Sequence, residues 1–154
     1  MVLARSLTVA AAFATVATMA IAGGHQGNPA VKARQSLMDL YGHNLYFLLG
    51  MTRDRTPYDA EQAQAAADSL VALTQVNQMR MWAPGTDSES EEGSRALAAI
   101  WENFPDVFAK VGATNAALAE LQKVAGDGLE AMGPAAVAAN QACNACHKDY
   151  RVQN

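Results

Sequence analysis

The sequence has little of what several classes of protein require. Its 154 residues include only two cysteines and three histidines, and 11 basic side chains stand against 15 acidic ones. A basic face that could meet phosphates is therefore missing, which argues against nucleic-acid binding. No segment alternates apolar and polar residues as a half-buried strand does. No acid–base pair or activated nucleophile is recognisable either, so nothing predicts an enzyme, and we assign no catalytic residues.

Long hydrophobic runs are also lacking, apart from one near the N-terminus. Residues 7–21 are apolar, follow Arg5 and lead to the small-residue cleavage site Ala20-Ile21-Ala22. A transmembrane anchor is the alternative interpretation, but this run is shorter than the roughly 18 to 20 residues that spanning requires. We interpret residues 1–22 as a secretory signal peptide. Residues 23–154 are then one periplasmic domain without a membrane anchor, and its acidic surface would favour a basic partner.

The residues that dominate the rest of the chain are Ala, Leu, Gln, Glu and Met, which favour helices. The pattern predicts four of them, at about 29–50, 60–81, 94–124 and 129–150. Asn28 and Asp59 are the expected N-caps of the first two helices, and Pro105 should kink or divide the third. An acidic loop over residues 83–94 makes one longer connection. The predicted fold is all-α, an antiparallel four-helix bundle, which commonly houses a cofactor between its helices.

Apolar residues at helical spacing give the expected core. In the first helix they are Leu37, Leu40, Tyr41, Leu45, Leu48 and Leu49. In the second they are Leu70, Leu73, Val76 and either Met79 or Met81. The third carries Leu97, Ile100, Trp101, Phe104, Phe108, Leu118 and Leu121.

Both cysteines lie in one motif, Cys143-Asn144-Ala145-Cys146-His147, which has the C-x-x-C-H form of c-type haem attachment. At about 100° per residue, the three reactive side chains fall within an arc of roughly 100° on a helix, so they can face one porphyrin. The two thiols would form thioethers with the haem vinyl groups. His147 would offer an imidazole nitrogen to the iron, which makes it the proximal ligand. The motif therefore predicts one covalent haem c.

Two cysteines in one motif also have other uses in proteins. A thioredoxin-like redox pair requires a βαβ context, which the Ala-rich stretch before the motif does not offer. A zinc site needs more ligands, and only His25 and His43 remain. A disulfide between helical positions i and i+3 would have poor geometry.

The position of the motif on the last of four helices makes the chain resemble the class II c-type cytochromes, the cytochrome c prime family and its low-spin relatives. The resemblance covers nearly all of residues 23–154. It depends on residues 31–36, 57–60 and 84–86, on Ile100-Trp101 and above all on residues 143–151, which read C-x-x-C-H-x-x-Tyr-Arg. In the class I fold, by contrast, the motif lies near the N-terminus of the mature chain.

The resemblance implies roles for further residues. Cys143 and Cys146 match the thioether anchors and His147 the proximal ligand, while Arg151 matches a basic residue beside the haem on the proximal side. Arg34 matches an arginine near the haem propionates, where a guanidinium would make charge-assisted hydrogen bonds. The alternative for either arginine is an ordinary surface charge.

Met38 follows Arg34 by four residues, and in the family that site points at the open face of the iron. Five-coordinate members have Leu or Phe there, whereas a thioether can bind, so Met38 resembles the distal ligand of low-spin His/Met members. Six other methionines show that the residue is often core filler, and helical spacing alone would place Met38 in the core. His43 is a rival ligand, but it lies roughly 140° around the helix from Met38.

The resemblance thus implies a periplasmic electron carrier in which both axial ligands stay bound. The alternatives are a five-coordinate protein that binds nitric oxide or carbon monoxide, and a thiol–disulfide enzyme without haem. The sequence identifies no redox partner. The resemblance favours a homodimer through the first two helices.

Overall fold

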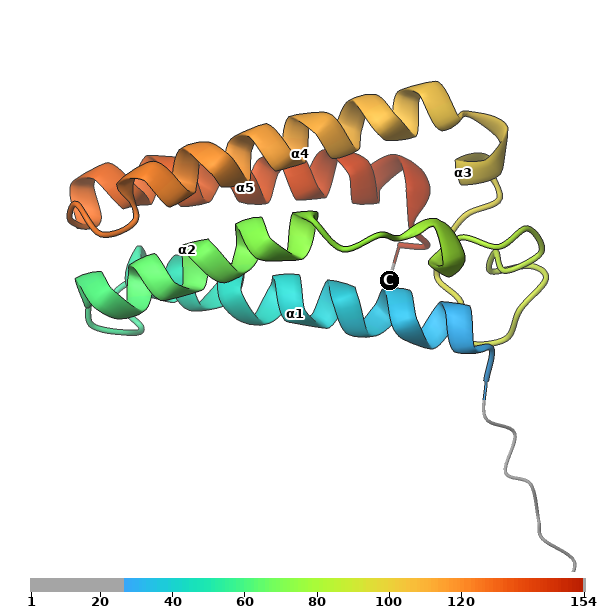
Figure 1. Ribbon diagram of the computed structural model, residues 1–154, viewed down its shortest axis with the longest axis horizontal. Coiled ribbons are helices and arrows are strands. Elements are labelled where there is room, and N and C mark those ends of the chain that lie inside the picture. The colour runs from blue at the N-terminus through green and yellow to red at the C-terminus, as the bar shows by residue number, and fades with distance from the viewer. Residues whose placement is uncertain (1–26, 154) are drawn as a thin grey trace, which may run out of the picture.

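Four long helices lie side by side in the computed structural model, which describes residues 27–153 (Figure 1). They are α1 (Pro29–Met51), α2 (Ala60–Thr74), α4 (Phe104–Val124) and α5 (Leu129–Tyr150). The connection after α2 contains a 3₁₀ turn, η1 (Met79–Met81), and a one-turn helix, α3 (Ala99–Glu102). α1 and α4 each pack against both α2 and α5. The predicted all-α four-helix bundle is confirmed, whereas the predicted signal peptide, residues 1–22, lies outside the described residues.

The starts of the first two helices follow from their caps. The Asn28 side chain accepts a hydrogen bond from the Ala30 N–H at 2.9 Å, with Pro29 in the first helical position. The Asp59 side chain accepts one from the Gln62 N–H at 2.9 Å. Each cap satisfies a backbone donor that the first turn leaves without a partner, and both predictions are confirmed.

The predicted end of the second helix was wrong, because α2 stops at Thr74 and not near Met81. The Gln75 and Val76 N–H groups already bond to carbonyls three residues back, which tightens the last turn. The Asn77 side chain then accepts a hydrogen bond from the Met79 N–H at 3.0 Å. This local bond competes with a helical backbone and turns the chain into η1.

The third predicted helix is two helices, and its predicted start at Ser94 was wrong. Pro105 is the second residue of α4, where its missing N–H costs no hydrogen bond, and Asn103 separates α4 from α3. Residues 94–97 instead run beside the segment that follows α5. There the Leu97 N–H donates to the Tyr150 carbonyl at 3.0 Å, and the Val152 N–H donates to the Arg95 carbonyl at 2.9 Å.

The buried apolar side chains form two separate clusters. The larger one joins the C-terminal halves of α1 and α4 to α2 and to the first turns of α5. The smaller one lies at the α3 end and contains Ala96, Ile100 and Tyr150, with Trp82 and Trp101 packed against it. Cys143 packs against the larger cluster and Cys146 against the smaller. One turn of α5 therefore contacts both halves of the core.

Several expected core residues are not in the core. Alanines line most of the inner face of α2, so large side chains are not needed where α2 packs closely. Side chains that were expected inside but are exposed are Leu40, Val76, Met79, Phe104 and Phe108.

None of the helices within residues 27–153 combines the length and the hydropathy that crossing a bilayer requires.

Candidate functional site

The two cysteines of the motif lie half-buried in the last two turns of α5, and both are free thiols. Burial raises the pKa of each thiol, and for Cys146 the neighbouring Asp106 and Asp149 carboxylates add to this while Lys110 opposes it. Nucleophilic cysteines show the opposite shift, because the thiolate is the reactive form. The direction of these pKa shifts is therefore opposite to that expected of the thiol–disulfide enzyme that the sequence left open.

His147 is half-buried beside the same turn. Burial lowers the pKa of its imidazole, and the positive charges of Arg151 and Arg95 lower it further. The ring is therefore neutral at neutral pH, which is the form that binds a metal ion. No cluster of three or more His, Cys, Asp or Glu side chains suited to a metal ion occurs among residues 27–153.

Arg151 follows α5 and faces Ala96 in an isolated bridge. Its Nε atom is buried and has no hydrogen-bond partner. Buried donors of this kind are rare in proteins, because each costs the free energy of lost hydration. An anionic acceptor beside His147, such as the carboxylate of a haem propionate, would satisfy it. Arg151 matches the basic residue that the resemblance implies beside the haem, and its Nε is an unpaired donor.

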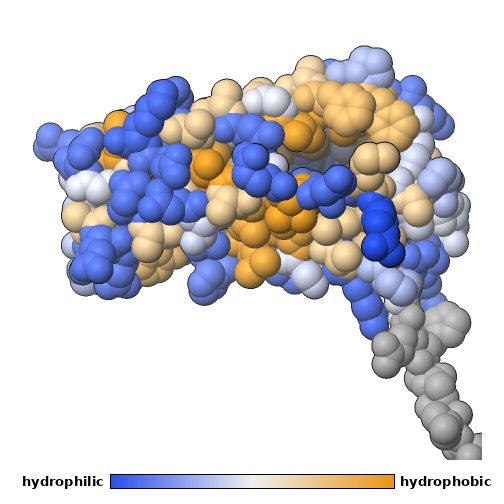
Figure 2. Space-filling view, in the orientation of Figure 1, coloured by the Kyte–Doolittle hydropathy of each residue, from blue (hydrophilic) through white to orange (hydrophobic). Residues whose placement is uncertain are grey.

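The face of the bundle drawn in Figure 2 has a hollow toward its α3 end, with hydrophobic side chains on both sides of it. A group attached to both Cys143 and Cys146 would contact both core clusters, because each cysteine packs against a different one. The thiols, the neutral imidazole and the unpaired guanidinium donor fit a covalently attached haem.

Met38 lies on α1, next to buried Leu37, and is itself 37% exposed. Tyr41, three residues on, is half-buried, and burial followed by the proximity of Cys143 raises the pKa of its phenol to about 12. Tyr41 therefore lies near the motif, and α1 packs directly against α5. Met38 and Tyr41 share a sector of the helix, so this sector of α1 faces the cysteines. The ligand role of Met38 stays a prediction.

Tyr41 was predicted only as core, and nothing local in the sequence distinguishes it from the other residues of the apolar stripe. His43, the rival ligand, lines a groove between α1 and α2 together with Phe47 and Gln62. His43 lies two residues after Tyr41, roughly 200° around the helix, whereas Met38 lies roughly 60° from it.

Arg34 is almost completely buried, but its partners lie in η1 and in the loop that follows it. Nη1 donates to the Met81 carbonyl at 3.2 Å and to Thr86 Oγ1 at 2.7 Å. Nη2 donates to Ser94 Oγ at 2.6 Å and to the Thr86 carbonyl. These four contacts account for all four donors of the two terminal nitrogens, so only Nε would remain for a propionate. The propionate role of Arg34 stays a prediction.

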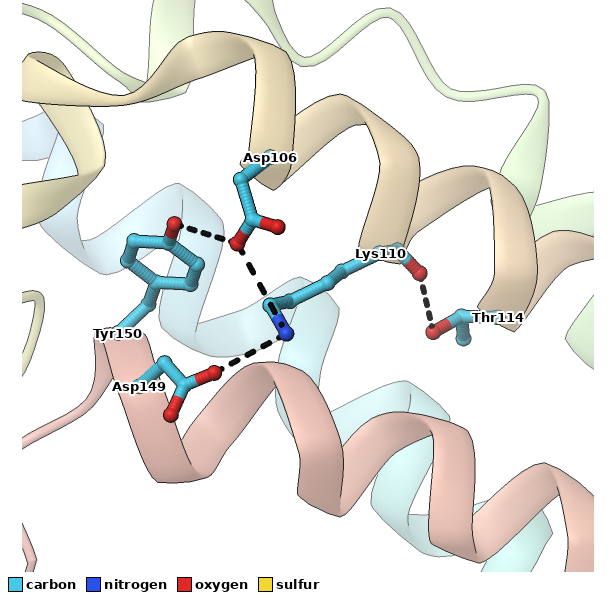
Figure 3. Close-up of polar contacts among 5 residues, drawn as sticks. All are labelled: Asp106, Lys110, Thr114, Asp149 and Tyr150. Atoms are coloured by element: carbon cyan, nitrogen blue, oxygen red, sulfur yellow. Dashed lines mark hydrogen bonds and ion pairs between the residues drawn. The ribbon is translucent and has the colours of Figure 1, made fainter.

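A polar cluster that the sequence analysis missed ties α4 to the last turn of α5 (Figure 3). Lys110 Nζ lies 3.0 Å from an Asp149 carboxylate oxygen and 3.7 Å from one of Asp106, and the Tyr150 hydroxyl donates to Asp106 at 2.7 Å. The pairs are partly exposed, so each contributes little stability alone. Their effect is to hold the turn that follows His147 against α4. The sequence indicates this cluster only through the spacing of Asp106 and Lys110, which are four residues apart and can pair on a helix.

Asp87 makes the stability of the loop after η1 depend on pH. Its carboxylate accepts hydrogen bonds from the Glu89 and Ser90 N–H groups at 2.9 and 3.0 Å. Hydrogen bonding from Ser90, and then from Glu89, lowers the pKa of Asp87 against the opposing effect of burial. Because folding lowers the pKa of Asp87, the stability that its carboxylate contributes is fully present above the ordinary pKa of about 4. This contribution is lost as the pH falls through the lowered pKa of the folded state.

We therefore expect Asp87→Asn to weaken the dependence of stability on pH in this acid range. The asparagine keeps an acceptor for the two N–H groups but has no charge to titrate. Thermal unfolding midpoints between pH 6 and pH 3 would decline less steeply in the variant than in the parent. Parallel declines would contradict the expectation.

An all-α four-helix bundle with a C-x-x-C-H motif on its last helix defines the class of bundle-type c cytochromes. Residues 29–151 match the family described as Cytochrome C'. The chain thus belongs to the cytochrome c' family, whose members carry covalent haem c and are generally not enzymes.

Individual relatives agree with this assignment. A cytochrome c-554 of Cereibacter sphaeroides is 37% identical over 144 residues, which cover 93% of this chain and 94% of the relative. A cytochrome c' of the same organism is 35% identical and covers 80% of this chain and 83% of its own length. Among solved structures, a cytochrome c' from Rhodobacter sphaeroides superposes with a TM-score of 0.79 at 34% identity, covering 81% of this chain and 96% of the other. A cytochrome c' with ligand-controlled dimer dissociation shares the fold at 23% identity, with a TM-score of 0.71 and coverage of 80% and 95%.

Proposed function

We propose that this protein is a periplasmic electron carrier with one haem c, bound through Cys143 and Cys146, with His147 as the proximal and Met38 as the distal iron ligand. The observation that carries the proposal is the sector of α1 that contains Met38 and Tyr41, which faces the cysteines of α5. A thioether at this place is available as a sixth ligand. The relatives named cytochrome c-554 support the same role.

When bound, the haem supplies an iron that takes up and releases one electron. The residues of the chain set the conditions for this. His147 offers a neutral nitrogen, and Met38 a soft sulfur that favours the ferrous state and so raises the reduction potential. Ligands that stay in place in both oxidation states keep structural reorganisation small. Arg151 would pair its free Nε donor with a propionate.

The partner and the assembly are part of the proposal. The electron donor and acceptor are unidentified redox proteins, which the chain meets after export by its signal peptide, residues 1–22. Leu40 and Tyr46 of α1 are 50% and 67% exposed. Apolar side chains left in water on α1 support a homodimer through α1 and α2.

The second candidate is a five-coordinate protein that binds nitric oxide or carbon monoxide. It is favoured by one observation, which is that Met38 is partly exposed and belongs to neither core cluster. Packing would then do little to keep the thioether at the iron. The similarity to proteins named cytochrome c' also supports this candidate.

Mass spectrometry and absorption spectroscopy of the exported protein test both candidates. We expect the mass of residues 23–154 plus one haem. Acid acetone should not extract the haem, because it is covalently attached. The oxidised protein should show a near-red sulfur-to-iron charge-transfer band. An unmodified mass would overturn the haem assignment. A coloured, high-spin protein without the band would instead favour the gas-binding candidate.

A further inference from the structure

The half of α1 that carries Met38 depends on a loop for its support. α1 is longer than α2, so its N-terminal turns extend beyond α2 and lie beside η1 and the loop that follows (Figure 1). The buried residues of this half are Val31, Arg34 and Leu37, and none of them belongs to either core cluster. This half of α1 is therefore held by contacts outside the two core clusters, and those with η1 are among them.

Arg34 makes the connection to that loop. Its four hydrogen bonds go to Met81, Thr86 and Ser94, and its Cζ atom lies 5.1 Å from the centre of the Trp82 ring. Burial lowers the pKa of the guanidinium, while Asp87 and Glu91 raise it. A buried guanidinium is costly unless its donors are paired, and its planar fork accepts few arrangements of its partners. The contacts therefore hold the loop in one position relative to α1.

The same loop is also hydrogen-bonded to the end of α5. Ser94 Oγ donates to the Thr86 carbonyl at 2.8 Å and accepts from the Ala96 N–H at 3.3 Å. The next residue, Leu97, donates its N–H to the Tyr150 carbonyl at 3.0 Å. Tyr150 lies three residues after His147, and Arg34 lies four residues before Met38. Hydrogen bonds, together with the peptide link between Ala96 and Leu97, thus connect the helical turns beside the two proposed iron ligands.

We propose that Arg34 is a positioning residue for the distal ligand, which acts through residues 81–97 to fix the Met38 turn of α1 relative to the His147 turn of α5. This inference rests on the proposed function, because it requires Met38 to bind the iron. It differs from the propionate role that the resemblance implies, since it assigns the effect to the contacts of Arg34 with Thr86 and Ser94. Loss of those contacts would leave Met38 present but less firmly bound.

The test uses the haem-containing protein with Thr86→Val and Arg34→Lys. Valine keeps the shape of threonine but removes the Oγ1 acceptor, and lysine keeps the charge but loses the fork. Carbon monoxide is the probe, because it binds the reduced iron only after Met38 leaves. Loss of a charge-assisted bond predicts about tenfold faster carbon monoxide binding and a weaker near-red sulfur band in the oxidised protein.

Gln35→Ala is the matched control. The Gln35 side chain also reaches the loop from α1, donating to the Gly93 carbonyl at 2.7 Å, but this contact is exposed. The control should keep the band and the carbon monoxide rate of the parent. If Arg34→Lys does not fold, Thr86→Val still carries the test, because the backbone acceptors of Arg34 remain.

The possible results separate the two proposals. A Thr86→Val protein with a lower unfolding midpoint but the band and carbon monoxide rate of its parent would show that Arg34 is only structural, and would overturn the positioning role alone. A parent protein that binds haem but lacks the sulfur band would overturn the carrier function, and the positioning role with it.

Discussion

Replacing Met38 with leucine is expected to make the oxidised protein largely high-spin and to lower its reduction potential by about 0.1 V, a fraction of the roughly 0.8 V that axial ligands span. Leucine has nearly the volume of methionine but no atom that binds iron, so the change removes the ligand and keeps the packing. Absorption spectra of the oxidised protein and a redox titration would measure both effects. The near-red band should disappear completely.

Met79→Leu is the control, because Met79 is 83% exposed in η1 and has no proposed role. It should keep the spectrum and potential of the parent. If Met38→Leu did the same, Met38 would be a packing residue, and the iron would need another sixth ligand or none.

A second large effect is expected from His147→Ala. Cys143 and Cys146 remain, so the haem can still be attached, but the protein loses its proximal ligand. Coordination of the iron by His147 forms only in the folded state, and an interaction that favours this state 100-fold adds about 2.7 kcal/mol. Each kcal/mol shifts the midpoint of a domain of this size by roughly 4 °C. We therefore expect the unfolding midpoint to fall by at least about 10 °C, measured by circular dichroism.

The neighbouring variant Lys148→Ala serves as its control, since Lys148 is exposed on the same turn of α5. It should unfold at the temperature of the parent and keep its spectrum. An attached haem and an unchanged midpoint in His147→Ala would mean that His147 does not bind the iron.

Features encoded within a few residues were predictable from the sequence. The caps at Asn28 and Asp59 and the break at Pro105 depend on local hydrogen bonding, and the structure has them as expected. The haem-attachment motif is local in the same sense, because one turn of helix carries both thiols and the imidazole.

Features that depend on distant segments were not predictable. The extended course of residues 94–97 follows from pairing with residues 150–152, which no local pattern indicates. The partners of Arg34 lie about 50 to 60 residues away, and the neutral state of His147 depends partly on Arg95. The proximity of Tyr41 to Cys143 likewise arises only when α1 packs on α5.

The place of α5 in the chain also has a consequence for biogenesis. This helix supplies residues to both core clusters, and it is synthesised after α1, α2 and α4. Neither half of the interior can close until α5 has emerged from the ribosome. The polypeptide must therefore remain loosely folded until its last helix has been made, which leaves its cysteines accessible to haem until then.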